Sequence, residues 1–251
     1  MKRLIPMLLL LSAFALLLAA CGGEATGSSD RQVLVMATSA DFPPFEFINE
    51  DGEYDGFDIH MARALAEILD MDLRIDNMDF GGVLTAVYTG RANIAIAAIS
   101  VTEERLQNVN FTNPYFGTTQ VVLVQDASDI TEIDQLENAR IAVQLGTTSD
   151  LVAGWYLPDA TVYRFNMAPD TILELRTGRV DAVIIDFTVA SLFMEQNPEI
   201  RMLEDVLAHE EYAIAVNRDQ TQLLEDLNEA LMQLQESSEF RRIYEMFFGG
   251  Q

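Results

Sequence analysis

The chain has 251 residues, 49% of them hydrophobic and 9% aromatic, and its formal net charge at pH 7 is −25. The hydrophobic share indicates a folded globular protein and excludes a disordered chain, so the acidity indicates surface charge. With 40 acidic and 15 basic residues, the chain repels nucleic acid and anionic phospholipid, and both are excluded as partners.

The N-terminus has the residue order of an export signal. Two basic residues precede an almost wholly apolar segment at 4–20, and small residues lead into Cys21, the only cysteine. The junction Leu18-Ala19-Ala20-Cys21 resembles the bacterial lipobox, which implies cleavage before Cys21 and acylation of its sulfur. We therefore predict a signal peptide at 1–20, a polar flexible tether at 21–31, and a protein held outside the cell membrane by lipid.

After the tether, short apolar runs alternate with segments of helical periodicity. The first group comprises strands at 32–38, 73–76 and 93–99, with helices at 58–69 and 81–88. The second group comprises strands at 139–143, 161–164 and 180–184, with helices at 147–155, 169–177 and 187–196. A strand at 212–216, an amphipathic helix at 223–234 and the segment 240–248 close the chain. This alternation predicts two α/β lobes with parallel sheets covered by helices.

Two β-like segments connect the lobes, at 115–122 and 209–215. One leads into the second lobe and the other leads out, so the first lobe is predicted to be discontinuous, at 32–115 and 213–251. The second lobe is predicted at 116–212, including the two hinge strands. A gap between two such lobes favours a ligand cleft.

Enzyme signatures are mostly absent. The sequence has no Gly-x-Ser-x-Gly elbow, no phosphate-binding glycine loop with lysine and no His-Glu-x-x-His. His60 and His209 lie far apart, and a zinc site needs more nitrogen or sulfur ligands than the chain offers. We therefore predict a binding protein without catalytic residues, metal or cofactor.

Three positions at predicted strand ends suit an α-amino acid, which needs donors for its carboxylate and an anion for its ammonium. Arg105 lies in the first turn of a helix that Thr102 can cap, and its guanidinium can grip a carboxylate at two points. Segment 146–149 begins a helix whose N–H groups can face an anion. Asp186 follows a strand at the carboxyl edge of its sheet. Singly, each is explained better by an ion pair, a turn or a cap; together they favour a ligand site.

Further segments extend this pattern over about residues 31–249. In chain order they are Ala37–Phe47, Gly56–Asp58, Ala98–Arg105, Phe111–Phe116, Val143–Thr148, Val180–Asp186 and Tyr244–Gly249. With them the chain resembles family 3 of the bacterial extracellular solute-binding proteins, the polar amino-acid receptors of ABC importers. The resemblance implies a two-lobed periplasmic-binding-protein fold of type II, a monomer, and ABC permease subunits as partners.

The resemblance also implies how the ligand backbone is held. Arg105 would pair with the ligand carboxylate, helped by the N–H groups of Ser100 and Thr148. Asp186 would bind the α-ammonium, with the Ala98 carbonyl and the Ser100 hydroxyl.

Around the ligand side chain, the resemblance implies that Phe42 and Phe80 form a sandwich, although two rings are equally compatible with core packing. Ser39 stands where many relatives that bind basic or amide side chains carry an acid. With Gln144, it offers hydrogen bonds without net charge unless Asp41 turns inward. A polar uncharged side chain is therefore expected, and a basic one stays open because the acidic chain attracts cations.

Two other functions stay open at this stage. Some relatives are cyclohexadienyl dehydratases, for which Asp41 is the nearest candidate acid. A ligand-sensing receptor domain is the second.

Overall fold

The computed structural model describes residues 31–249. The predicted signal peptide, the lipidation site at Cys21 and all but the last residue of the predicted tether lie outside the described residues. From Gln32 onward the chain forms one compact unit. Among the described residues, no helix combines the length and apolarity needed to cross a bilayer.

The first large sheet belongs to the first lobe. In spatial order its strands are β5 (Asp72–Asn77), β1 (Val33–Thr38), β6 (Ile94–Ala95), β13 (Ala215–Asn217) and β7 (Val109–Phe111). β1 pairs in parallel with β5 and β6. β13 pairs antiparallel with β6 and β7.

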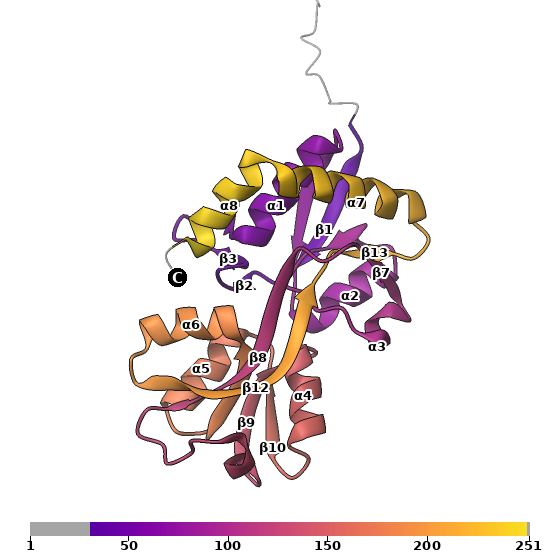
Figure 1. The fold of residues 1–251 in the computed structure, drawn as a ribbon. Coiled ribbons are helices and arrows are strands. Elements are labelled where there is room, and N and C mark those ends of the chain that lie inside the picture. The colour runs from indigo at the N-terminus through magenta and orange to yellow at the C-terminus, as the bar shows by residue number, and fades with distance from the viewer. Residues whose placement is uncertain (1–30, 250–251) are drawn as a thin grey trace, which may run out of the picture. The chain divides into compact units, whose positions relative to one another are not determined.

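Helices cover this first sheet (Figure 1). They are α1 (Phe57–Ile68), α2 (Phe80–Tyr88), α7 (Thr221–Glu236) and α8 (Ser238–Phe248). α1 packs against α7 and α8, whereas α2 packs against β1 and β13. Successive β1 side chains point to opposite faces of the sheet, as the two-residue period of a strand requires. Leu34 and Met36 pack in one hydrophobic cluster and Ala37 packs in another.

The second large sheet belongs to the second lobe. Its spatial order is β10 (Thr161–Phe165), β9 (Arg140–Gln144), β11 (Ala182–Asp186), β8 (Phe116–Gln125) and β12 (Ile200–Tyr212). The first three strands are mutually parallel, and β8 is antiparallel to β11 and β12. The accompanying helices are α4 (Thr148–Tyr156), α5 (Ala168–Arg176) and α6 (Phe187–Gln196).

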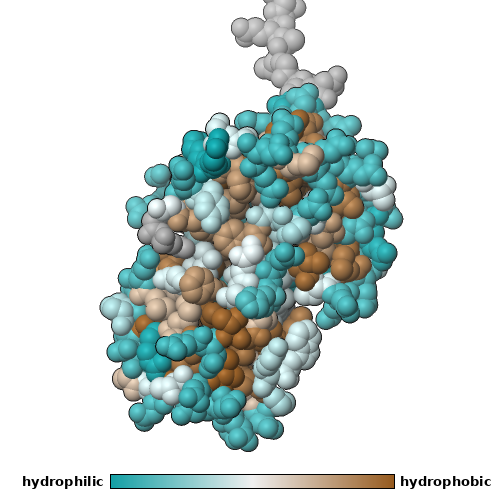
Figure 2. All heavy atoms as spheres, in the orientation of Figure 1, coloured by the Kyte–Doolittle hydropathy of each residue, from teal (hydrophilic) through white to brown (hydrophobic). Residues whose placement is uncertain are grey.

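β8 and β12 connect the lobes, and Figure 1 shows them running side by side out of the second sheet toward the first. Their pairing continues as far as Phe116 and Tyr212. The predicted two-lobed α/β fold with a two-strand hinge is confirmed. In the orientation of Figure 2, hydrophilic residues cover most of the periphery and apolar residues reach the surface toward the middle.

The structure corrects several predicted elements. The sheets are mixed, because β13 in the first sheet and β8 in the second run opposite to the other strands of their sheet. The strand expected at 93–99 is only β6, because Ala98 adopts a left-handed φ of 45° that an extended strand cannot include. The hinge strand that leads out of the second lobe, β12, ends at Tyr212 and not at 215 as predicted. Ala215 belongs instead to β13, which pairs with β7 in the first sheet.

Strand β7 and residues 200–208 of β12 were not predicted, and neither were two smaller features. One is a three-stranded sheet of β2 (Asp41–Phe42), β3 (Glu46–Ile48) and β4 (Tyr54–Asp55). The other is the short 3-10 helix at Ile133–Leu136. The predicted helix after Thr102 is α3 (Glu103–Leu106), where the Thr102 hydroxyl accepts from the Arg105 N–H at 3.2 Å.

Candidate functional site

A small cavity of about 10 Å³ lies between the lobes. Every predicted ligand contact lines it except Ser39, which donates to Asp41 Oδ1 at 2.9 Å. The lining residues are Asp41, Phe42, Phe80, Ala97, Ala98, Ser100, Arg105, Gln144, Thr147, Thr148 and Asp186. The fold therefore gathers positions that the sequence separates by more than a hundred residues.

Arg105 is the cation of this cavity, and it is 8% exposed. Its guanidinium donates to the Ser100 carbonyl at 2.7 Å and, across the cleft, to the Gly146 carbonyl at 3.2 Å. Its Cζ lies 5.7 Å from the centre of the Phe80 ring, within range of a cation–π interaction. Among the described residues no carboxylate forms an ion pair with it, so it keeps N–H donors for an anion.

Asp41 turns inward, which the sequence left open. Its Oδ2 accepts from Gln144 Nε2 at 3.0 Å and from the Ala168 N–H at 2.9 Å, and both donors belong to the second lobe. Burial raises the pKa of this carboxyl, opposed by these hydrogen bonds and the one from Ser39. An acid therefore stands at the end of the cavity near Ser39 and Gln144.

Asp186 ends β11 and lies at the carboxyl edge of its sheet, as predicted. It is 5% exposed, and its Oδ1 accepts a very short hydrogen bond from the hydroxyl of Tyr212. Burial and the negative charge of Glu210 raise the pKa of Asp186 to about 7. A ligand ammonium here would favour the ionised carboxylate.

Glu210, on hinge strand β12, was not predicted as a site residue. Its Oε2 accepts from Ser100 Oγ at 2.5 Å, Thr148 Oγ1 at 2.7 Å and Gln120 Nε2 at 3.2 Å. Ser100 and Thr148 come from different lobes, so this carboxylate bridges the cleft. The alternation of side chains along β12 offered the only signal: Tyr212 is buried, and Glu210 lies two residues before it on the same face.

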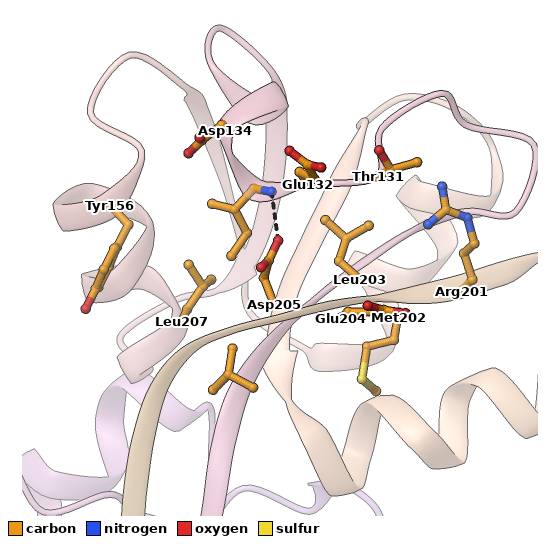
Figure 3. Close-up of a pocket in the computed structure, with 12 residues that line it drawn as sticks. Thr131, Glu132, Asp134, Tyr156, Arg201, Met202, Leu203, Glu204, Asp205 and Leu207 are labelled. Atoms are coloured by element: carbon orange, nitrogen blue, oxygen red, sulfur yellow. Dashed lines mark hydrogen bonds between the residues drawn. The ribbon is translucent and has the colours of Figure 1, made fainter.

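A larger pocket of about 760 Å³ lies within the second lobe, beside β12 (Figure 3). It is lined by several acids, among them Glu132, Asp134, Glu204 and Asp205. Asp205 accepts from the Ile133 N–H at 3.3 Å, and no predicted ligand contact lines the pocket. Within residues 31–249 no group of three acidic, histidine or cysteine side chains is placed to hold a metal ion.

Residues 34–250 match the family described as bacterial extracellular solute-binding proteins, family 3. The chain belongs to this family. Its members lie outside the cytoplasm, which agrees with the predicted export.

Individual relatives of this family cover nearly the whole chain. The "Probable histidine-binding protein" of Neisseria gonorrhoeae is 32% identical, covering 100% of this chain and 98% of its own. An ancestral arginine-binding protein solved with arginine bound has a TM-score of 0.82 and 36% identity, covering 87% of this chain and 99% of its own. AncCDT-1, an ancestral amino acid-binding protein and precursor of cyclohexadienyl dehydratase, has a TM-score of 0.81 and 31% identity, covering 86% and 95%.

Proposed function

We propose that this solute-binding protein captures an amino acid with a cationic side chain, such as arginine, and delivers it to an ABC importer. The observation that carries the proposal is the charge of the cleft. Asp41 and Asp186 line the cavity and Glu210 accepts hydrogen bonds from its lining residues Ser100 and Thr148, whereas Arg105 is the one cation of the lining. A ligand whose side chain adds a positive charge to the zwitterion therefore balances this negative charge better than a ligand with an uncharged side chain.

Each ligand group has a matching protein group in this proposal. The ligand carboxylate binds the free donors of Arg105 and the N–H groups at the start of α4, near Thr148. The α-ammonium binds Asp186, with the Ala98 carbonyl and the Ser100 hydroxyl. The side chain passes Phe42 and Phe80, whose rings line the cavity, and its cationic end reaches Asp41.

Capture follows from closure of the lobes. Residues 32–115 with 213–251 move as one body and residues 116–212 as the other, and a ligand that contacts both favours the closed form. The closed form is what the permease recognises. The receptor is a monomer, held at the outer face of the membrane by acyl chains on Cys21.

The relatives support this choice of ligand. One is named for histidine and another was solved with arginine. The arginine side chain is cationic at neutral pH, and that of histidine becomes cationic below about pH 6.5. Together with the inward Asp41, this favours the basic side chain over the uncharged one, which the sequence left as alternatives.

Isothermal titration of the mature protein with L-arginine, L-histidine, L-glutamine and L-glutamate tests the proposal. We expect L-arginine or L-histidine to bind more tightly than L-glutamine, and L-glutamate to give no measurable heat. Tighter binding of L-glutamine or L-glutamate would contradict the assignment of a cationic ligand.

The alternative of an enzyme has one specific support, the likeness to a precursor of cyclohexadienyl dehydratase. We propose that the chain is not an enzyme, because Asp41 is engaged by three hydrogen-bond donors and not free to transfer a proton to a substrate. Incubation with prephenate and with arogenate should yield no aromatic product, and product formation would overturn this conclusion.

A further inference from the structure

Two buried carboxyl groups next to the cavity have no part in the binding scheme above. Glu46 lies in β3 and Asp58 in the first turn of α1, and both are 0% exposed. Neither Glu46 oxygen has a donor, and Asp58 Oδ1 has none either. Two ionised carboxylates buried in this way would repel each other and lack solvation, which strongly disfavours ionisation of both.

The backbone brings these two residues together. Gly56, with φ of 118°, precedes α1, and a Cβ at this position would lie 2.3 Å from the Phe45 carbonyl oxygen. Glycine therefore lets the strand segment pack directly on the start of the helix. The Asp58 N–H donates to that same carbonyl at 2.8 Å, which places Glu46, the next residue along β3, beside Asp58.

Asp58 also holds a residue of the cavity wall. Its Oδ2 accepts from the Ala98 N–H and from the Tyr115 hydroxyl, each at 2.8 Å. Ala98 lines the cavity in a left-handed conformation that costs free energy for a residue with a Cβ. Tyr115 in turn donates its N–H to the Tyr212 carbonyl at 2.8 Å, at the end of hinge strand β12.

We propose that Glu46 and Asp58 share one proton and act as a positioning pair that holds the Ala98 peptide in the wall of the ligand site. The Glu46 carboxyl keeps the proton and donates it to Asp58 Oδ1, which leaves Oδ2 free to accept from Ala98 and Tyr115. The effect of this pair on ligand binding rests on the proposed function, because the Ala98 carbonyl is the proposed contact of the ligand ammonium.

The surroundings of the pair favour one retained proton. Burial, followed by the charge of Asp58, raises the pKa of Glu46 well above its ordinary value, and the more distant charges of Asp41 and Asp186 act in the same direction. Burial also raises the pKa of Asp58 to about 6, opposed by its hydrogen bonds, while Tyr115 beside it stays protonated. At neutral pH the pair thus carries one negative charge.

Infrared spectroscopy tests the shared proton without any ligand. At pH 7.5 the difference spectrum of wild type minus Glu46→Gln should show the carbonyl stretch of a protonated carboxyl group, because the contribution of Asp186, whose pKa is about 7, is present in both proteins and cancels. Glu50→Gln, which changes an exposed glutamate of the adjacent loop, should retain this carbonyl stretch. Identical spectra for the wild type and Glu46→Gln would overturn proton sharing, whatever the protein binds.

Ligand titration tests the positioning role. Glu46→Leu removes the donor, so L-arginine should bind about tenfold more weakly, whereas Glu46→Gln, whose amide restores a donor, should recover most of that loss. Wild-type affinity in Glu46→Leu would overturn the positioning role. If no variant, including the wild type, binds an amino acid, the proposed function fails while the infrared result stands.

The pH dependence of stability covers the case in which Glu46→Leu does not fold. Because folding raises the pKa of Glu46, its stabilising contribution is present at low pH and is lost as pH rises from the ordinary glutamate value toward the folded one. The free energy of unfolding of the wild type should therefore fall relative to that of Glu46→Gln over this range. If the free energies of unfolding of the two proteins changed in parallel with pH, the result would contradict proton sharing between Glu46 and Asp58.

Discussion

The inter-lobe cavity and the pocket of Figure 3 differ in size, burial and chemistry. The cavity is the smaller by far, at about 10 Å³ against about 760 Å³. In the cavity, charged side chains are almost wholly buried and join opposite lobes, as Arg105 and Asp41 do. In the pocket, Glu204 and Asp205 are exposed, and Arg201 donates to backbone carbonyls of its own lobe.

Burial of charge, and not volume, therefore distinguishes the recognition site. A buried guanidinium or carboxylate has lost its water and gains most from a ligand of opposite charge. An exposed acid is already solvated and gains little. Substitutions of matched type in the two regions should therefore have unequal effects on binding.

We expect the strongest loss of affinity when Arg105 is replaced. Arg105→Ala should weaken L-arginine binding at least about a hundredfold, because it removes the buried partner of the ligand carboxylate. Arg201→Ala, the matched change in the pocket, should leave affinity unchanged. Titration calorimetry on both variants makes the comparison, with circular dichroism to verify folding. Comparable losses in both would break the distinction between the regions.

The next effect is the pH dependence imposed by Asp186. Since its pKa is raised to about 7, the carboxyl is increasingly protonated below that pH and must release its proton to bind an ammonium. Affinity for L-arginine should therefore fall by up to about tenfold per pH unit between pH 7 and pH 5. Asp186→Asn should bind weakly with a flatter profile. A flat wild-type profile would remove Asp186 from the site.

Asp41 should affect the preference for L-arginine over L-glutamine more than it affects the overall affinity for amino acids. Asp41→Asn should reduce the preference for L-arginine over L-glutamine by about tenfold, because the side-chain end loses its negative charge. Asp51→Asn, an exposed aspartate of the same lobe, serves as the control and should keep the wild-type ratio. An unchanged ratio in Asp41→Asn would indicate that the cationic group binds elsewhere.

The smallest effect is expected in the pocket. Asp205→Ala removes the acceptor of the Ile133 N–H, an exposed hydrogen bond, and should cost at most about 1 kcal/mol of unfolding free energy. Ligand affinity should not change. Urea unfolding and calorimetry measure the two quantities, and a loss of affinity would make the pocket part of the binding mechanism.

The sequence alone predicted the two α/β lobes and most of the candidate site. Hydrophobic periodicity located the main helices and strands, because each must bury one face. Arg105, Asp186 and the start of α4 could be chosen from their places at strand ends, since the chemistry of a zwitterion requires those groups.

Other features of the site depend on contacts between distant segments, which local sequence does not encode. The direction of Asp41 depends on donors from Gln144 and Ala168, more than a hundred residues away. The inward carboxylate of Glu210 depends on the register of β12 with β8, and the proximity of Glu46 to Asp58 depends on a close backbone approach at Gly56. Residue type and periodicity are local properties, whereas the partner that a buried charge finds is fixed only when distant segments pack together.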